Sequence, residues 1–265
     1  MMARGAAPAG LDSSVDGLSA DAATASELFA VVDLIDGQPM LRRSLSDPSA
    51  SFEDRSGLAK RLFGARVSAS TLAVIMEVLG ASWGSGADMV AGIERQGIRL
   101  ALQSAHRAGD IDEVADQLHT LAATIDSSPE LAGTLRNQTY PVEAKKSLVD
   151  TLIAGKVHPV TRTLAGRAVR ARRRNIAQTV GAILEMAADV AGEKIARVTV
   201  ARPLDEARVA RLKRALEAQV GRTVSLQIDV DPSVLGGMNV AIDDDVIEST
   251  VAARLDQARR QLNSR

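Results

Sequence analysis

The sequence predicts a mainly α protein: two tandem helical bundles, one a duplicate of the other, followed by a small α+β module. Three observations predict this fold. The 265-residue chain contains only 2% aromatic residues, so its core must be built from Leu, Val, Ile and Ala, a mixture that favours helices. One stretch matches a second stretch at an offset of 90 residues, and the last third changes to alternating strand periodicity.

The composition excludes several classes of protein. The net charge of −1 excludes a globally basic nucleic-acid binder, and the absence of cysteine excludes disulfides, thiolate catalysis and cysteine-ligated metal sites. No run of 18 apolar residues is present, and the first 16 residues lack the apolar core of a signal peptide. We expect a flexible segment over residues 1–20 and a cytosolic chain that reaches a membrane only through a partner.

The repeat relates residues 27–72 to residues 117–162 without gaps. Eleven of the 46 pairs are identical, against roughly four expected by chance in such a composition. The identical pairs are Leu28/Leu118, Ile35/Ile125, Asp36/Asp126, Pro39/Pro129, Leu41/Leu131, Leu45/Leu135, Glu53/Glu143, Leu58/Leu148, Leu62/Leu152, Val67/Val157 and Thr71/Thr161. The pattern predicts two bundles of five or six short helices, over residues 21–95 and 96–192.

Residues 193–265 have the pattern of an α+β module. Two alternating segments, 196–201 and 223–230, predict strands, and the helix between them has Asp205 as its N-cap and Gly221 after its end. A third strand with Met238, Val240 and Ile242 then turns into a short antiparallel return, and a final helix begins near residue 249.

Two motifs in this module resemble ligand loops but predict a turn and a hairpin instead. Gly236 and Gly237 precede a strand, whereas a phosphate-binding loop needs its glycines between a strand and a helix. Asp243, Asp244 and Asp245 lack the alternating ligand spacing of a calcium loop. We therefore expect a bulge or a left-handed turn at the glycines and a solvated hairpin turn at the aspartates.

The stretch "DPSVLGGMNVAIDDDVIESTVAARLDQARRQL", together with "KIARVTVARPLDEARVARLKRALEAQVGRTVSLQIDV", resembles the C-terminal domain of the δ subunit of F-type ATP synthases, the family of the oligomycin sensitivity-conferring protein. "RQGIRLALQSAHRAGDIDEVADQL" and "SSPELAGTLRNQTYPVEAKKSLVDTL" resemble helices of the family's N-terminal domain. Residues 96–265 thus resemble a complete δ subunit. Residues 21–95 resemble the additional N-domain of long actinobacterial forms.

This resemblance implies a stator subunit without catalytic residues or a cofactor. In the family, the subunit joins the N-terminal segments of the α subunits to the C-terminal helix of the b subunit in the peripheral stalk. The protein would then lie at the cytoplasmic face of the cell membrane, held there by the complex. For the α-binding groove, helical spacing and the resemblance select seven apolar residues: Ile98, Leu102, Ala105, Leu164, Ala168, Val180 and Ile183. Each of them is also a candidate for the bundle core.

Two alternative functions remain open at this point. A generic helical adaptor would show the same apolar helix faces. A nucleic-acid binder would use the segment 156–184, which carries seven basic residues and no acidic one, although no aromatic residue interleaves there for base stacking. A metal or catalytic role has little support, because His106, His119 and His158 are far apart without ligand spacing. Trp83 is expected to be a packing anchor of the first bundle.

Overall fold

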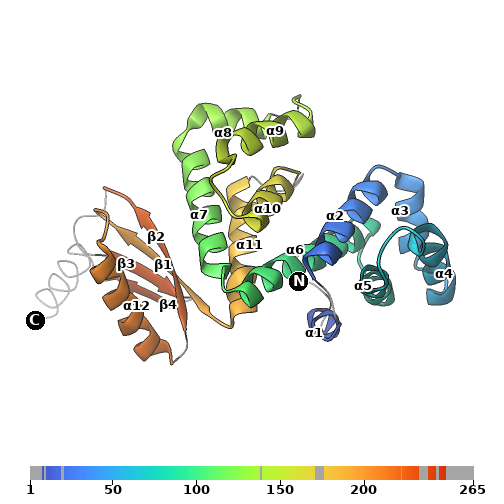
Figure 1. Ribbon diagram of the computed structural model, residues 1–265, viewed down its shortest axis with the longest axis horizontal. Helices are drawn as coiled ribbons and strands as arrows, with labels where there is room; N and C mark the ends of the chain where they lie inside the picture. Colours follow the sequence, from blue (N-terminus) through green and yellow to red (C-terminus); the bar gives the residue numbers. More distant parts are fainter. Residues whose placement is uncertain are drawn as a thin grey trace, which may run out of the picture. The chain divides into compact units, whose positions relative to one another are not determined.

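The computed structural model describes residues 8, 10–18, 21–137, 139–170, 176–221, 223–232, 238–242 and 245–248, and contains helices and one mixed sheet (Figure 1). It divides into two compact units, Met1–Gly109 and Asp110–Arg265. None of the described helices is both long and apolar enough to cross a bilayer.

The first unit is entirely helical in its described part. Its helices are α1 (Leu11–Asp16), α2 (Ala22–Asp36), α3 (Pro39–Ser46), α4 (Phe52–Phe63), α5 (Ala69–Gly80) and α6 (Gly86–Ala108). Ser51, Ser68 and Ser85 accept hydrogen bonds from the first-turn amides of α4, α5 and α6, and so fix where these helices begin. Gly109 adopts a left-handed conformation and ends α6.

Two glycines of α6 make room for aromatic rings that pack against this helix, Trp83 from the loop before α6 and Phe29 from α2. A Cβ atom at Gly92 would lie 2.2 Å from Cη2 of Trp83, and a Cβ atom at Gly97 would lie 2.7 Å from Cε1 of Phe29. The Trp83 indole N–H donates to the carbonyl of Val78 at 2.7 Å, which holds the ring against α6. Trp83 is therefore a packing anchor, as the sequence predicted. Gly92 has no side chain and so leaves room for the Trp83 ring, as Gly97 does for the Phe29 ring.

The segment expected to be flexible contains a folded part, because α1 is docked within the first unit. Leu11 and Val15 are buried. Asp12 accepts from Arg95 at 2.7 Å and from Gln96 at 2.8 Å, while both carboxylate oxygens of Asp16 accept from Arg99, at 2.9 and 2.7 Å. Within the segment 1–20 that was expected to be flexible, α1 is thus a helix held by two buried apolar side chains and by charge-assisted bonds to its two aspartates.

The second unit begins with five helices, α7 (Ile111–Ser127), α8 (Pro129–Arg136), α9 (Val142–Ile153), α10 (Pro159–Arg170) and α11 (Ile176–Ala191). Adding 90 to the bounds of α3 and α4 gives the bounds of α8 and α9, and adding it to the first residue of α5 gives the first residue of α10. The offset that was read from residue identities is thus also the offset between the helices. We call it the 90-residue register.

The domain boundary expected at residues 95 and 96 falls inside the continuous helix α6, whereas the two compact units meet at Gly109 and Asp110. By the register, the counterpart of α1 is residues 101–106, which form part of α6. One helix therefore contains both the last helix of the first series and the counterpart of its first.

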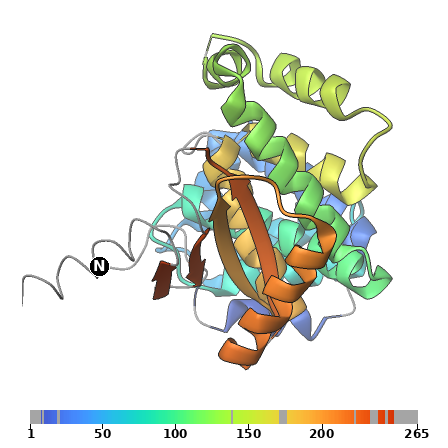
Figure 2. The ribbon, with the colours of Figure 1, turned by 90° about the vertical axis from the view of Figure 1, so that its left-hand side faces the viewer.

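The second unit ends in a mixed sheet that confirms the predicted α+β module. Its strands are β1 (Lys194–Val200), β2 (Val224–Val230), β3 (Met238–Ile242) and β4 (Asp245–Glu248), in the order β2-β1-β3-β4. β1 and β2 are parallel and joined through α12 (Glu206–Val220), whereas β3 runs antiparallel to β1 and to β4. The helix α12 lies along the sheet (Figure 2). Asp205 caps α12 and Gly221 ends it, as the sequence predicted.

The core of this module lies between the sheet and α12. Ala196 and Val198 of β1, Val224 of β2 and Val240 of β3 are buried together with Leu216 of α12. Alternate residues of each strand supply this face, as the period of two requires. Gly236, Gly237, Asp243, Asp244 and the predicted final helix lie outside the described residues. Asp245 is the first residue of β4, so the predicted antiparallel return is present.

Candidate partner-binding surfaces

The seven residues predicted to line a binding groove lie on three helices. Ile98, Leu102 and Ala105 are on α6, Leu164 and Ala168 on α10, and Val180 and Ile183 on α11. All except Ile98 are no more than 2% exposed. A buried side chain touches a partner only after the helices that cover it separate. The groove therefore stays a prediction, and Ile98 is its one partly accessible member.

A hydrogen-bond clamp occurs at the same register position in both helical series. In the first unit, one carboxylate oxygen of Glu27 on α2 accepts from the backbone N–H and the hydroxyl of Ser68, both at 2.8 Å, and from the hydroxyl of Thr71. These bonds tie the N-terminus of α5 to the middle of α2. They also hold the pKa of Glu27 below its ordinary value, with the Thr71 bond as the largest cause.

In the second unit the side-chain oxygen of Gln117 on α7 takes this position. It accepts from the backbone N–H of His158 and from the hydroxyl of Thr161, both at 2.8 Å. Residues 117, 158 and 161 are residues 27, 68 and 71 plus 90. His158 belongs to this clamp, and its Nε2 lies 3.4 Å from Asp110.

A second matched bond pattern lies in the loops before α4 and α9. Asp47 Oδ1 accepts from the backbone N–H and the hydroxyl of Ser49, at 2.9 and 2.7 Å. Asn137 Oδ1 accepts from the same groups of Thr139, at the same two distances. Both are local side-chain turns that reverse the chain before a helix. The register therefore extends to individual side-chain bonds.

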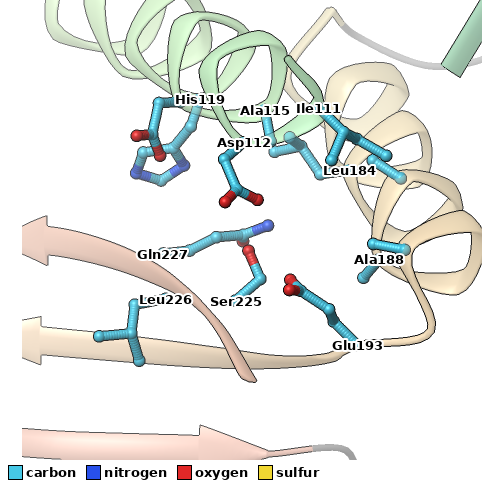
Figure 3. Close-up of a pocket in the computed structure, with 13 residues that line it drawn as sticks. Ile111, Asp112, Ala115, His119, Leu184, Ala188, Glu193, Ser225, Leu226 and Gln227 are labelled. Carbon is cyan, nitrogen blue, oxygen red and sulfur yellow. The ribbon is translucent and has the colours of Figure 1, made fainter. Parts of the chain in front are cut away.

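The described cleft between the helices and the sheet of the second unit is small and acidic (Figure 3). Asp112, Asp116 and His119 of α7 face Glu193, and Ser225 and Gln227 of β2. Burial raises the pKa of Asp116, and the charge of Asp112 adds to that effect. His119 Nε2 lies 3.3 Å from Asp229 Oδ1. Within the described residues no group of His, Cys, Asp and Glu has the geometry of a metal site.

The basic segment 156–184 is partly engaged within the chain. Arg162 pairs with Asp150 at 3.0 Å, and Arg170 pairs with Glu143 at 3.2 Å. Arg167 is buried. Residues 171–175, which include three of the arginines, lie outside the described residues. The described arginines thus support helix packing, which weakens the case for a phosphate-binding stripe.

Sequence reasoning missed the clamp and the docking of α1. One signal for the clamp was visible, because Thr71/Thr161 is an identical pair at the start of a helix. Its acceptor was not, since Glu27 and Gln117 differ. For α1, the apolar pair Leu11 and Val15 at i, i+4 spacing, flanked by Asp12 and Asp16, was the available signal.

Comparison with known proteins identifies related sequences over most of the chain. The family model described as "ATP synthase delta (OSCP) subunit" matches residues 101–262. An "ATP synthase subunit delta" of Parafrankia sp. is 38% identical over 239 residues, which cover 90% of this chain and 86% of that protein. An "ATP synthase subunit delta" of Streptomyces griseus is 36% identical over 254 residues, covering 95% and 94%.

A chain in the cryo-EM structure of the Toxoplasma gondii mitochondrial ATP synthase hexamer also aligns, with a TM-score of 0.36 and 20% identity, over 62% of this chain and 94% of that chain. At this TM-score the likeness supports no conclusion about this chain.

Proposed function

This chain belongs to the ATP synthase delta (OSCP) subunit family, and from that premise we propose which parts of the complex it joins. It is a non-catalytic stator subunit of ATP synthase. We propose that its helical series bind the N-terminal segments of the α subunits, and that its C-terminal module binds the C-terminal helix of the b subunit. The chain then lies at the cytoplasmic face of the cell membrane, held there by the complex.

The stator role follows from the mechanics of a rotary enzyme. Torque on the catalytic head yields ATP only if the head cannot turn with the central stalk. A stator subunit must therefore hold the catalytic head fixed to the peripheral stalk, and it catalyses no reaction itself. Short helices with matched side-chain clamps suit this task, because directional bonds as well as packing fix α5 to α2 and α10 to α7.

We further propose that the two helical series are duplicated N-domains. The single observation that carries this is the clamp, since three bonded positions in one series recur 90 residues later in the other. Two domains of one kind offer two attachment points to the head. When both are engaged, the second binds at a high effective concentration, and the joint is tighter than either contact alone.

The function is tested by reconstitution. The full chain is added to membranes whose ATP synthase has been stripped of this subunit, and proton-driven ATP synthesis is measured. We expect synthesis to return, while ATP hydrolysis by the detached head is unchanged because the chain contributes no catalytic group. The control is Leu118→Asp, which places a charge in the buried interior of the second unit and should not restore synthesis. Failure of the native chain to bind the stripped complex would overturn the proposal.

The α-binding groove is tested by cross-linking, which the chain permits because it contains no cysteine. A single cysteine replaces Ile98, the partly accessible member of the groove, and carries a photoreactive group. We expect it to label the N-terminal segment of an α subunit in the assembled complex. The matched control is Ala30→Cys on the exposed side of α2, which should not label it. Labelling only elsewhere would remove α6 from the groove.

A further inference from the structure

A stripe of two leucines between two basic residues occurs on α4 and again on α9. The first stripe consists of Arg55, Leu58, Leu62 and Arg66, and the second of Lys145, Leu148, Leu152 and Lys156. The spacing is three, four and four residues in both, which places the members on one side of a helix and of the turn that follows it. Both stripes occupy the same positions of the 90-residue register.

The central leucines are exposed in both helical series. Leu62 is 37% exposed and Leu152 is 42% exposed, while Leu58 and Leu148 are half-buried. The next residues along each helix, Phe63 and Ile153, are buried. Core packing explains the apolar residues at 63 and 153. It does not explain a leucine on the outer face at the same place in both series.

Two other exposed apolar residues of the first unit differ from their register counterparts, whereas Phe52, the first residue of α4, has an apolar counterpart in Val142, the first residue of α9. Leu34, which is 39% exposed, corresponds to Thr124, and the highly exposed Met40 corresponds to Glu130. Outside α4 and α9, the exposed large apolar residues of the first series thus have polar counterparts in the second. The shared leucines at 62 and 152 therefore call for a neighbour that the isolated chain lacks.

The charges beside the leucines define the chemistry of that neighbour. Arg55 donates to the carbonyl of Leu79 at 3.0 Å, and Lys145 is buried, so these two basic residues serve the bundle interior. Arg66 and Lys156 are exposed, and neither forms an ion pair with another described residue. Each face therefore combines an apolar turn of helix with one cation available to a partner.

We propose that the exposed C-terminal end of each stripe, Leu62 with Arg66 at the end of α4 and Leu152 with Lys156 at the end of α9, docks an amphipathic helix that carries a carboxylate beside its apolar stripe. The two occupants are of the same kind and belong to the ATP synthase complex, so this inference rests on the proposed function. The leucines pack into the apolar stripe of the partner, and Arg66 or Lys156 pairs with its carboxylate. These faces are separate from the predicted groove on α6, α10 and α11.

The test measures binding of the full chain to ATP synthase stripped of this subunit. Leu62→Asp and Leu152→Asp each put a carboxylate where the partner presents another and remove the apolar contact. We expect each to weaken binding by about tenfold, and the double variant by more than either, because a buried anchor residue dominates such contacts. Raising the salt from about 50 to about 500 mM should weaken the native chain more than an Arg66→Gln, Lys156→Gln variant.

Leu34→Asp is the matched control, because Leu34 is as exposed as Leu62 but has no leucine counterpart. Its binding should equal that of the native chain. All variants should keep native circular dichroism, since the substituted leucines are 37–42% exposed and none of them belongs to the buried core. If the native chain does not bind, the proposed function fails. If it binds and the double variant binds equally well, the function stands and this inference is overturned.

Cross-linking identifies the occupant. Arg61→Cys and Thr151→Cys place a photoreactive group beside Leu62 and beside Leu152, at matched exposed positions. In the reconstituted complex, we expect each to label a helical peptide with acidic residues next to an apolar stripe, identified by mass spectrometry. Labelling of a basic or non-helical segment, or of none, would contradict the proposal.

Discussion

The two clamps perform the same task with different chemistry. Glu27 accepts three hydrogen bonds with a carboxylate oxygen, and Gln117 accepts two with an amide oxygen, yet both fasten the start of the fifth helix of a series to the second. The shared features are the position of an oxygen and the donors that meet it. The negative charge is thus dispensable for the geometry, although it makes the first clamp sensitive to pH.

The interiors differ more than the clamps do. In the first series, Gly92 and Gly97 admit the rings of Trp83 and Phe29. Their register counterparts are Ala182 and Ala187, and the counterpart of Phe29 is His119. At the same register positions, aromatic rings therefore pack against glycine backbone in the first series, whereas the second series has alanine side chains there. Core volume can be redistributed while the helix layout stays the same.

The largest effect is expected where the two interiors agree. Leu28 and Leu118 are both fully buried. Leu28→Ala and Leu118→Ala should each lower the free energy of unfolding of their own unit by about 2–5 kcal/mol, because each leaves a cavity. Urea unfolding followed by the fluorescence of Trp83, the only tryptophan, reports on the first unit, whereas circular dichroism reports on both. A fluorescence transition that shifts equally in both variants would show that the units do not unfold separately.

The next largest effect is expected where the interiors of the two helical series differ, at Gly92 and its counterpart Ala182. Gly92→Ala places a methyl group inside the Trp83 ring and should destabilise the first unit by about 1–3 kcal/mol. The reciprocal change Ala182→Gly should cost about 0.5–1 kcal/mol, through helix propensity alone. The same fluorescence-detected unfolding and circular dichroism measure both. A Gly92→Ala variant more stable than the native chain would contradict the packing role of the glycine.

A smaller effect distinguishes the clamps by pH. The pKa of Glu27 is lowered in the folded chain, so its stabilising contribution is present above the ordinary glutamate pKa of about 4.3 and is lost as the pH falls through the lowered value. Glu27→Gln should remove this acid sensitivity while keeping the clamp. Glu27→Ala should break the clamp and cost about 1–2 kcal/mol at neutral pH. The measurement is urea unfolding of the native chain, Glu27→Gln and Glu27→Ala between neutral and acid pH. If Glu27→Gln loses stability in acid as the native chain does, the acid sensitivity does not come from the Glu27 carboxylate.

The last effect concerns α1, which has no free-standing counterpart in the second series. The hydrogen bonds from Arg99 to Asp16 hold the pKa of that aspartate below its ordinary value. Arg99→Ala should loosen α1 at a cost of about 1 kcal/mol, since the pair is partly exposed. Hydrogen exchange of residues 11–16 should rise. Arg197→Ala, which breaks the exposed pair with Glu185, is the control and should leave the exchange unchanged.

Much of the fold could be predicted because helix ends and strand alternation are local signals. Pro39 and Pro129 mark the first residues of α3 and α8, and Asp205 and Gly221 bound α12. The repeat predicted the helix order because its identical pairs include Leu28/Leu118, Ile35/Ile125 and Leu45/Leu135, which are buried, and residues at helix ends. Of the strand pairings, only the antiparallel return of β4 on β3 was predicted, whereas the structure supplied the parallel pairing of β1 with β2 and the antiparallel pairing of β1 with β3.

The boundary and the binding surfaces could not be predicted in the same way. Residue identities at this offset continue into α6, at Ala87/Ala177, Val90/Val180 and Ile93/Ile183. None of them distinguishes a helix that ends near residue 95 from one that continues beyond it. Helical spacing also cannot distinguish an apolar residue that lines a groove from one in the interior, and Leu102, Leu164 and Val180 are interior in the isolated chain. The clamp was hidden because its acceptor changes from Glu27 to Gln117 while its geometry persists.

The continuity of α6 limits how this protein can be shortened. A chain that starts at residue 96 would begin in the middle of α6, and a chain that ends at residue 95 would lose Arg99, the ligand of Asp16. To add or delete a helical series, the chain should therefore be cut in whole steps of 90 residues, within loops at matched register positions. Every junction then contains an intact α6.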